Sequence, residues 1–411
     1  MELNADFHIH GRYSGGTSDD MNIPLIASHA PLKGLDVVAT ADALHSGWRK
    51  HLTEHLREKD GLYVSQHSKT RFIIQTEIED KNRVHHILLL PSLEAAESLH
   101  GKFKPYSKNL DTDGRPNIDL GGEDVVGYVN DAGGLVGPSH AFTPWTSIYK
   151  SHDCLRDCYG ANLKHVHFLE LGLSADTDMA DRISELKDLT FMSNSDCHSP
   201  WPHRLGREFN KVLVENPSFE EIVKALKHEG GRGFTLNAGL NPLEGKYHVT
   251  ACTRCFLKFN WSQAQKIKRR CPECGGLIKK GVEERAKELA DLEKPAHPRH
   301  RPPYLKIIPL AEAISLAYGI RTITSKKVKG IWDGLVGAFG TEIKVLLDVD
   351  LDELKEKDAK IASVIELLRQ GKLRYVAGGG GRYGHPTLAN EKDIYYSGDQ
   401  KTIGDYCGST E

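Results

Sequence analysis

The sequence has no apolar run approaching the ~18 residues that a membrane span needs, and Met1–His8 contains neither a basic nor an apolar leader segment. We therefore expect no membrane helix and no signal peptide, and a protein of the reducing cytoplasm. In that compartment the eight cysteines are metal ligands or free thiols rather than disulfides. A strong excess of one charge is also missing: the formal net charge is −2, so any site for a polyanion must be local.

The positive charge is concentrated in one short segment. Residues 246–280 hold nine Lys and Arg residues against one acid, Glu273, which makes this segment +8 and the remainder of the chain −10. With 39% apolar and 27% charged residues in 411, the chain has material for about two to four folded domains. The composition thus predicts a basic module inside an acidic chain.

Four regions follow from the patterning along the chain. Residues 1–244 alternate strand-like apolar runs with helical stretches, which favours an α/β fold with a parallel sheet, open or closed into a barrel. Residues 245–281 form the cysteine-rich basic module, 282–303 a charged helix and Pro-rich linker, and 304–411 a mainly helical domain with a Gly-rich loop. The expected strands of the first region are 35–40, 72–76, 84–90, 135–136, 166–171 and 190–192. Its expected helices are 23–30, 93–99 and 219–228.

The first chemical motif is Asp6-Phe-His8-Ile-His10 near the N-terminus. In a strand, side chains alternate between faces, so His8 and His10 would lie on one face and can bind one metal ion. The alternative is a pair of surface histidines beside a strand.

Similar groups recur at the ends of later predicted strands, and this recurrence favours the metal hypothesis. In a β/α barrel, active-site residues come from the C-terminal ends of different strands. A ring of histidines and carboxylates there can hold several divalent ions. These groups are Asp42, His45, Glu77, His85, His86, His140, Glu170, Asp196 and His198.

Together, His8-Ile-His10, Asp42, Glu77, His86, His140 and Ser195-Asp-Cys-His198 resemble the polymerase-and-histidinol-phosphatase (PHP) superfamily over residues 1–240. The resemblance implies a distorted (β/α)7 barrel that holds two or three divalent metals (Zn, Mn or Mg) and hydrolyses phosphoesters. Alternation does not distinguish His85 from His86, and the family pattern favours His86. The chain departs from many members at Asp42, which is followed by Ala43 instead of histidine.

The same resemblance implies roles for these residues. One ion would be held by His8, His10, Glu77 and Asp196, and Glu77 would bridge to a second ion bound by His86 and His140. Asp42 and His198 would serve a third ion. Asp196, Glu77 and His140 are the expected catalytic residues.

The second motif pairs Cys252-x2-Cys255 with Cys271-x2-Cys274. Two such knuckles can supply four thiolates to one tetrahedral, structural zinc ion, which would supply folding energy to a module with little core. The cations around them are interleaved with aromatic residues, a combination typical of nucleic-acid binding, whereas the alternative is a solvated charged face. The expected DNA-binding residues are Arg204, Lys258, Lys266, Lys268, Arg269 and Arg270.

Over nearly its full length the chain resembles one family, endonuclease Q. The resemblance includes the barrel, the four-cysteine module, Pro302–Leu310 and Gly378–Gly384. It implies a DNA-repair endonuclease that extrudes a deaminated base (uracil, hypoxanthine, xanthine) or an abasic site and cuts on its 5′ side, leaving a 3′-hydroxyl and a 5′-phosphate. Its expected partner is damaged double-stranded DNA, and its expected location is the nucleoid. Whether it also binds a sliding clamp or other repair proteins is left open by the sequence. The alternatives are a small-molecule phosphatase of the histidinol-phosphatase type and a non-specific nuclease.

Overall fold

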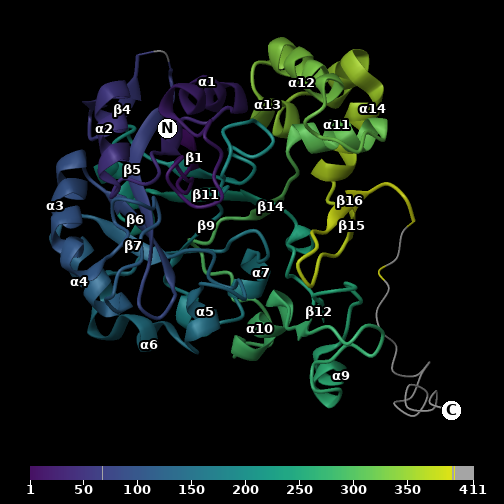
Figure 1. Ribbon diagram of the computed structural model, residues 1–411. Helices are drawn as coiled ribbons and strands as arrows, with labels where there is room; N and C mark the ends of the chain where they lie inside the picture. The colour runs from purple at the N-terminus through teal and green to yellow at the C-terminus, as the bar shows by residue number, and fades with distance from the viewer. Residues whose placement is uncertain (67, 391–392, 394–411) are drawn as a thin grey trace.

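The computed structural model describes residues 1–66, 68–390 and 393. Figure 1 shows a large barrel built by the first half of the chain, a small module at the lower right and a helical domain at the upper right. Residues 391–392 and 394–411 of the predicted C-terminal domain lie outside the described residues. No helix in the described ranges is long and apolar enough to cross a membrane.

A closed ring of strands forms the barrel. Its members are β1 (Glu2–Asp6), β2 (Val37–Ala39), β5 (Arg71–Glu79), β6 (His85–Leu90), β7 (Leu135–Pro138), β8 (Phe168–Glu170) and β9 (Thr190–Met192). Ladders join β1, β2, β5, β6 and β7 in that order, and β8 pairs with β9. Two isolated bridges complete the ring: Val136 with Val166 before β8, and Ile9 after β1 with Cys197 after β9. This arrangement confirms the predicted α/β fold with a distorted barrel of seven strands.

One strand runs opposite to the expected direction. β6 pairs antiparallel with both β5 and β7, so the sheet is mixed and not wholly parallel. The connection from β5 to β6 spans only residues 80–84, which is too short for a helical crossover. Asp80 closes this turn, since its side chain accepts the N–H groups of Asn82 and Val84 at 2.8 Å each. The start of β6 therefore lies beside the C-terminal end of β5.

Further strands extend the sheet beyond the ring, from β5 in one direction and from β1 in the other. They are β3 (Leu56–Lys59), β4 (Leu62–Ser65), β10 (Phe209–Leu213), β11 (Gly233–Gly239) and β14 (Tyr304–Lys306). β10 pairs antiparallel with β1 and β11, and β14 pairs in parallel with β11. The first residues of the region predicted as 304–411 thus belong to the barrel sheet.

Short helices cover the outside of the barrel (Figure 1). They are α1 (Ile23–Lys33), α2 (Ser46–His55), α3 (Leu93–Phe103), α4 (Gly122–Asp131), α5 (Ile148–Ser151), α6 (Leu155–Tyr159), α7 (Thr177–Ala180) and α8 (Phe219–Leu226), with 3₁₀ turns at Lys104–Tyr106, Gly160–His165, Ser184–Leu186 and Pro242–Glu244. The sequence signals for these helices are conventional caps: the Asn22 side chain accepts the N–H of Leu25, and Gly34 ends α1 with a φ of 94°.

The cysteine-rich module consists of β12 (Ala251–Cys252), α9 (Trp261–Lys266) and β13 (Ile278–Lys279). Its own core is small and centres on Phe259, Ala264 and Ile278. The following helix, α10 (Val282–Leu289), buries Val282 in the barrel core instead. The Pro-rich stretch is also fixed on the barrel, because the Arg301 Nε donates to Asp181 at 2.9 Å.

The C-terminal domain has a separate apolar core. Its elements are α11 (Leu310–Tyr318), α12 (Lys326–Phe339), α13 (Glu342–Leu347), α14 (Leu351–Arg369), β15 (Arg374–Val376) and β16 (His385–Thr387). A buried ion pair joins it to the barrel, with the Lys33 Nζ 2.5 Å from the Glu342 carboxylate. The Gly-rich loop packs against the start of the cysteine-rich module (residues 245–281, below also called the zinc module). A Cβ at Gly378 would lie 2.5 Å from the Gly245 carbonyl oxygen. Glycine is therefore required there by close backbone approach.

Candidate metal centres

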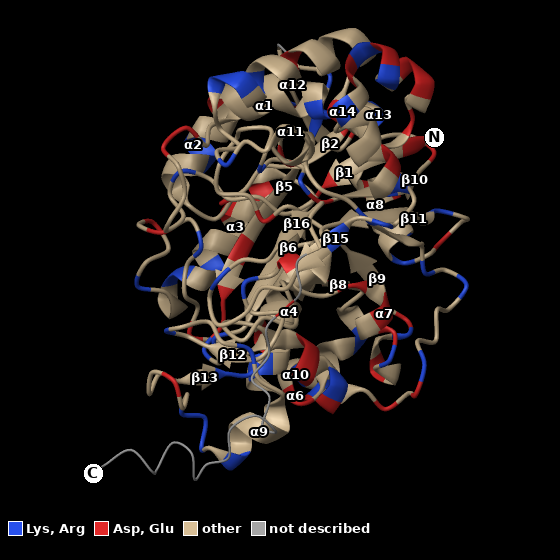
Figure 2. Ribbon diagram, turned by 90° about the vertical axis from the view of Figure 1, so that its right-hand side faces the viewer, with Lys and Arg blue, Asp and Glu red and all other residues tan. Residues whose placement is uncertain are grey.

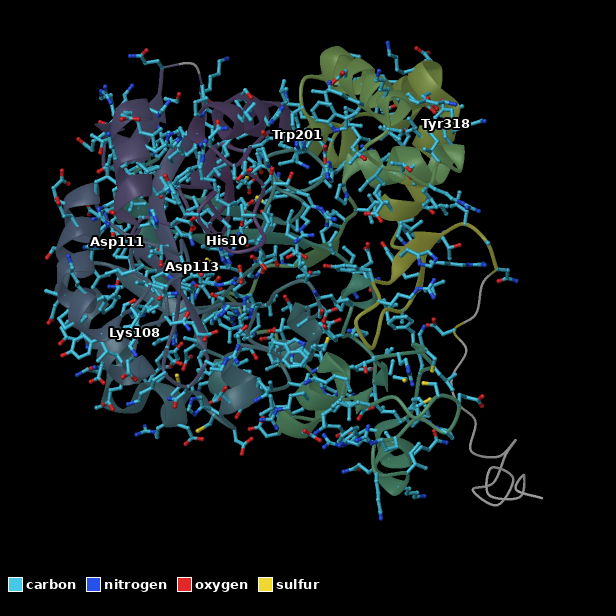
Figure 3. The ribbon with its side chains drawn as sticks, in the orientation of Figure 1. His10, Lys108, Asp111, Asp113, Trp201 and Tyr318 are labelled. Carbon is cyan, nitrogen blue, oxygen red and sulfur yellow. The ribbon has the colours of Figure 1, made fainter. Side chains whose placement is uncertain are left out.

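The end of β1 places two histidines inside the barrel. The rings of His8 and His10 are 5.1 Å apart, and both side chains are buried. Figure 3 labels His10 within the barrel. Burial lowers the pKa of His10 to about 4, so that this imidazole is neutral, as a metal ligand must be. Asp6 does not join them: its carboxylate accepts the N–H groups of Ser195 and Gly206 and fixes the segment that carries Asp196.

Glu77, on β5, lies between two groups of histidines. One carboxylate oxygen is 3.3 Å from the His10 Nε2 and 3.7 Å from the His8 Nε2. The other is 3.1 Å from the His85 Nδ1 and 3.2 Å from the His140 Nε2. Burial alone would raise the pKa of Glu77, but charged His85 and His8 nearby hold it well below its usual value. A carboxylate shared in this way is suited to bridge two ions.

Asp196 and His198 complete the first group from the loop after β9. The Asp196 carboxylate is 3.0 Å from the His10 Nε2, and the His198 ring is 4.3 Å from the His10 ring. Asp42 lies behind His10, 3.9 Å from its Nδ1, and accepts a hydrogen bond from the Ser14 hydroxyl at 2.8 Å. The structure therefore brings Asp42 and His198 to the edge of the same cluster.

Three of these residues have an unusual backbone. Asp42, His140 and Asp196 have φ values of 33°, 29° and 44°, in the left-handed region that non-glycine residues seldom adopt. Such conformations cost about 1–3 kcal/mol each and occur mainly at functional sites. At His140 the backbone is held in place because its N–H donates to Glu170 at 2.8 Å.

The preference for His86 over His85 is reversed by the structure. The His85 Nε2 bonds to Glu79 at 3.2 Å, which leaves its Nδ1 facing Glu77. His86 points to the other side of β6, where its ring nitrogens contact Tyr159 at 3.1 Å and Asp80 at 3.3 Å. Alternation along a strand predicts that only one of two adjacent histidines can face the site, and register with β5 decides which.

Two further residues support the cluster. Glu170, one of the strand-end acids expected from the sequence, accepts from the His8 Nδ1 at 3.0 Å and so directs the Nε2 of that ring into the cluster. Arg115 places its Nη1 3.4 Å from Glu77, from the 107–121 segment that has no helix or strand. No periodicity or motif marks Arg115 in the sequence.

The donors of the barrel cluster fit divalent metal ions. The His8 Nε2 and the Asp42 Oδ2 are buried and have no hydrogen-bond partner among the described residues. Such orphaned polar atoms are costly unless a further group binds them. Ligand atoms of His8, His10 and Glu77 lie within 4.8 Å of one another, as do those of Glu77, His85 and His140. A mixed imidazole and carboxylate set suits Zn²⁺ or Mn²⁺.

The four-cysteine cluster has a different geometry. The Cys252 and Cys274 sulfurs are 3.5 Å apart, and those of Cys255 and Cys271 are 3.6 Å apart. A tetrahedral zinc ion with Zn–S bonds of ~2.3 Å places its sulfurs about 3.8 Å apart, close to these values. A hydrogen bond from the backbone of Gly276 lowers the pKa of Cys274 to about 7, which favours the thiolate form. The four thiols fit one structural zinc ion.

The predicted DNA-binding cations divide into two groups. Lys266, Lys268, Arg269 and Arg270 are exposed on the zinc module, and Figure 2 shows blue segments around β12, β13 and α9. Lys258, by contrast, is buried and forms an ion pair with Asp393, so it does not belong to the exposed basic surface. Arg204 is half-buried near Glu312, and burial lowers the pKa of its guanidinium. The pattern of cations interleaved with aromatic residues in this segment did not distinguish Lys258 from the exposed cations.

A distorted β/α barrel whose rim gathers histidines and carboxylates around a shared glutamate is the arrangement of a metal-dependent hydrolase. Residues 309–372 match the family described as the MJ0043 C-terminal domain.

Solved structures that are similar over the full chain identify its family. The chain is 45% identical to the lesion-specific endonuclease PfuEndoQ from Pyrococcus furiosus, covers 100% of both chains and superposes with a TM-score of 0.89. It is 46% identical to Endonuclease Q in a complex with a 27-mer duplex that has an abasic lesion at the active site, with 95% and 97% coverage and a TM-score of 0.90. The chain belongs to the endonuclease Q family.

Two curated relatives have no assigned function. YqxK of Bacillus subtilis is 31% identical over 404 residues, which are 93% of this chain and 98% of YqxK. MJ0043 of Methanocaldococcus jannaschii is 49% identical over 279 residues, 67% of this chain but only 34% of MJ0043. The chain thus matches about a third of MJ0043.

Proposed function

We propose that this protein is a metal-dependent DNA-repair endonuclease that cuts the phosphodiester 5′ of a deaminated base or an abasic site. Deaminated bases here are uracil, hypoxanthine and xanthine, and the products would be a 3′-hydroxyl and a 5′-phosphate. The observation that carries the proposal is the position of Glu77 between two groups of histidines. The chain that holds this cluster is similar, along its length, to an endonuclease that has an abasic lesion at its active site.

The barrel residues would hold two divalent ions. His8, His10, Glu77 and Asp196 fit one ion, and Glu77, His85 and His140 fit the second. Asp42 and His198 are the donors for a third. When bound, the ions would bind the scissile phosphate, activate water for in-line attack and stabilise the departing oxygen.

The chain's own residues prepare this chemistry. Glu170 and Glu79 accept from the outer nitrogens of His8 and His85, which fixes the orientation of both rings. Arg115, with a pKa raised above its usual value by the charge of Glu77 despite burial, stays a cation beside the cluster and can face the phosphate oxygens. The fold thereby aims fixed donors at one point before substrate arrives, which is the basis of electrostatic preorganisation.

The zinc module would hold the duplex across the barrel rim. Exposed Lys266, Lys268, Arg269 and Arg270 can neutralise phosphates without reading sequence. Lesion choice would then come from the lower cost of extruding a mispaired or missing base. Such a DNA-bound protein would be found at the nucleoid.

The test uses a 5′-labelled duplex with one deoxyuridine, a second with one abasic site, and a third with thymidine at that position. With Mn²⁺ or Mg²⁺ we expect one product, ending directly 5′ of the lesion, and an intact thymidine duplex; EDTA should abolish cleavage. Equal degradation of all three duplexes would indicate a non-specific nuclease. No cleavage of any duplex, together with hydrolysis of histidinol phosphate, would replace the proposal with a small-molecule phosphatase.

A further inference from the structure

The loop that follows His140 carries an exposed tryptophan. Trp145 is 52% exposed, although most large apolar side chains of the barrel are buried. Its ring reaches the zinc module, where the Lys279 Nζ lies 3.7 Å from the ring centroid. It also meets the edge of Tyr247, with ring centroids 6.2 Å apart at 71°. Trp145 therefore lies where the barrel rim and the zinc module meet.

Hydrogen bonds fix this loop to the metal cluster. The Thr143 hydroxyl donates to the Trp145 carbonyl oxygen at 2.7 Å and lies 3.3 Å from the His140 Nδ1. On the other side, the backbone N–H of His85 donates to the carbonyl oxygen of Thr146 at 3.0 Å. Thr146 has a φ of 47°, an unfavourable conformation for a β-branched residue. A constrained loop thus presents Trp145 at a fixed position relative to His140 and His85.

Trp145 begins a row of aromatic rings and cations. The Lys246 Nζ lies 5.4 Å from the Tyr247 centroid and 5.7 Å from the Tyr383 centroid. Tyr383 is 56% exposed and follows the Gly-rich loop that packs on the module. Exposed rings that alternate with lysines are the usual platform for unstacked nucleotides, because bases stack on the rings and phosphates meet the cations.

A basic cleft lies beside the same loop. Its volume is about 380 Å³ and it is lined on the barrel side by Thr143 and Lys150, and on the module side by Arg269, Lys279 and Lys280. Arg285 also lines it, and five cations around one cleft favour an anionic ligand such as a phosphate backbone over a neutral or basic one. The cleft gives the DNA strand a path from the zinc module to Trp145.

We propose that Trp145 stacks on the DNA base exposed when the lesion nucleotide leaves the helix, and so holds the opened duplex beside His140 and His85. This inference rests on the proposed function. Stacking of one base on an aromatic side chain is worth roughly ten- to a hundredfold in affinity. Trp145 is therefore a positioning residue, whose contribution depends on whether the duplex must be opened.

The experiment compares two substrates for each variant: a paired duplex with one abasic site, and the same site within a bubble of unpaired bases. Trp145→Ala should lower the cleavage rate roughly ten- to a hundredfold on the paired duplex and less than about threefold on the bubble. Trp145→Phe should retain most activity on both. Leu213→Ala is the control, because Leu213 is 41% exposed and pairs with Glu2, at the end of β1 away from His8.

A second readout does not depend on cleavage. With 2-aminopurine next to the abasic site and Ca²⁺ as the only divalent ion, the wild type should change the probe's fluorescence and Trp145→Ala should not. Equal loss of cleavage on paired and bubble substrates, or an unchanged fluorescence response in Trp145→Ala, would overturn the proposal. If the wild type cuts neither substrate, the proposed endonuclease function fails, while the fluorescence comparison still decides the role of Trp145 in binding.

Discussion

The barrel cluster and the four-cysteine cluster are two metal centres built in opposite ways. In the barrel, ligand candidates come from strand ends between His8 and His198, and two buried ligand atoms, the His8 Nε2 and the Asp42 Oδ2, have no hydrogen-bond partner among the described residues. In the module, four thiols between Cys252 and Cys274 surround one point at nearly tetrahedral spacing. Structural zinc sites are closed by protein ligands, whereas catalytic sites keep positions for water and substrate. In the proposed function, the barrel therefore carries the chemistry and the module holds the DNA.

The two centres also differ in what holds them together. The barrel ring forms around a large apolar core, and this core can maintain strained residues such as Asp42 and Asp196. The module buries only a few apolar residues around Phe259, so its fold should depend on the metal. Removal of metal should therefore inactivate the barrel without unfolding it, and unfold the module.

The largest expected effect comes from the barrel. Asp196→Ala removes the carboxylate that lies 3.0 Å from the His10 Nε2, and should lower the cleavage rate about 10³-fold or more, since metal stabilisation is worth several kcal/mol. The dissociation constant for lesion DNA should change by less than about threefold. Asp131→Ala, an exposed acid on α4, is the matched control and should cleave normally. Near-wild-type cleavage by Asp196→Ala at equal metal content would remove the barrel from the reaction.

The next effect distinguishes the two adjacent histidines of β6. His85→Asn should lower cleavage roughly 10²-fold, because it removes a ring nitrogen 3.1 Å from Glu77. His86→Asn should cleave at close to the wild-type rate but lose about 1–3 kcal/mol of unfolding free energy, since its contacts to Tyr159 and Asp80 are buried. Single-turnover rates and thermal unfolding of both variants measure the difference. The reverse pattern would restore His86 as the ligand.

A smaller effect is expected from the module. Cys271→Ser should release one equivalent of zinc and weaken DNA binding about ten- to a hundredfold, because the metal-dependent fold presents the cations. The melting transition of the barrel should stay in place. Elemental analysis and fluorescence anisotropy with labelled duplex provide the two measurements. An unchanged zinc content would contradict the four-thiolate site, and an unchanged affinity would contradict the DNA-holding role.

The smallest effect separates exposed from buried cations within the module. Arg269→Ala should weaken DNA binding severalfold and reduce the slope of log affinity against log salt by about one, as expected for loss of one phosphate contact. Lys258→Met should leave that slope unchanged, because Lys258 is buried and paired with Asp393. Titrations at several salt concentrations compare them. Equal slopes for the two variants would show that burial does not determine which of these cations contacts a DNA phosphate.

The sequence predicts correctly which residues lie together wherever their proximity depends on local spacing. The two Cys-x2-Cys pairs and His8-x-His10 are such patterns, and the structure brings the four cysteines together and places both histidines in one cluster. Glu77, His140 and Asp196 were predicted as strand-end residues, and the closed ring of strands explains why they meet. These residues are close in space because the barrel topology converts strand ends into one rim.

What sequence could not provide depends on register and long-range packing. His85 faces the site because β6 runs antiparallel to β5 after a short turn, which apolar patterning does not encode. Lys258 is buried and pairs with Asp393, far along the chain. Arg115 reaches Glu77 from a segment without periodicity. For Lys258 and Arg115 the deciding partner is distant in sequence, whereas for His85 it is the register of two neighbouring strands.

The most direct test of the division between the two centres is the single-turnover cleavage rate on one abasic duplex, measured with protein concentrations that saturate the DNA. Asp196→Ala should be at least about 10³-fold slower than the wild type however much DNA is bound. Cys271→Ser should cleave within about tenfold of the wild type once its weaker binding has been overcome by concentration. Cleavage by bound Asp196→Ala at the wild-type rate, or its abolition in fully bound Cys271→Ser, would contradict the assignment of chemistry to the barrel and DNA holding to the zinc module.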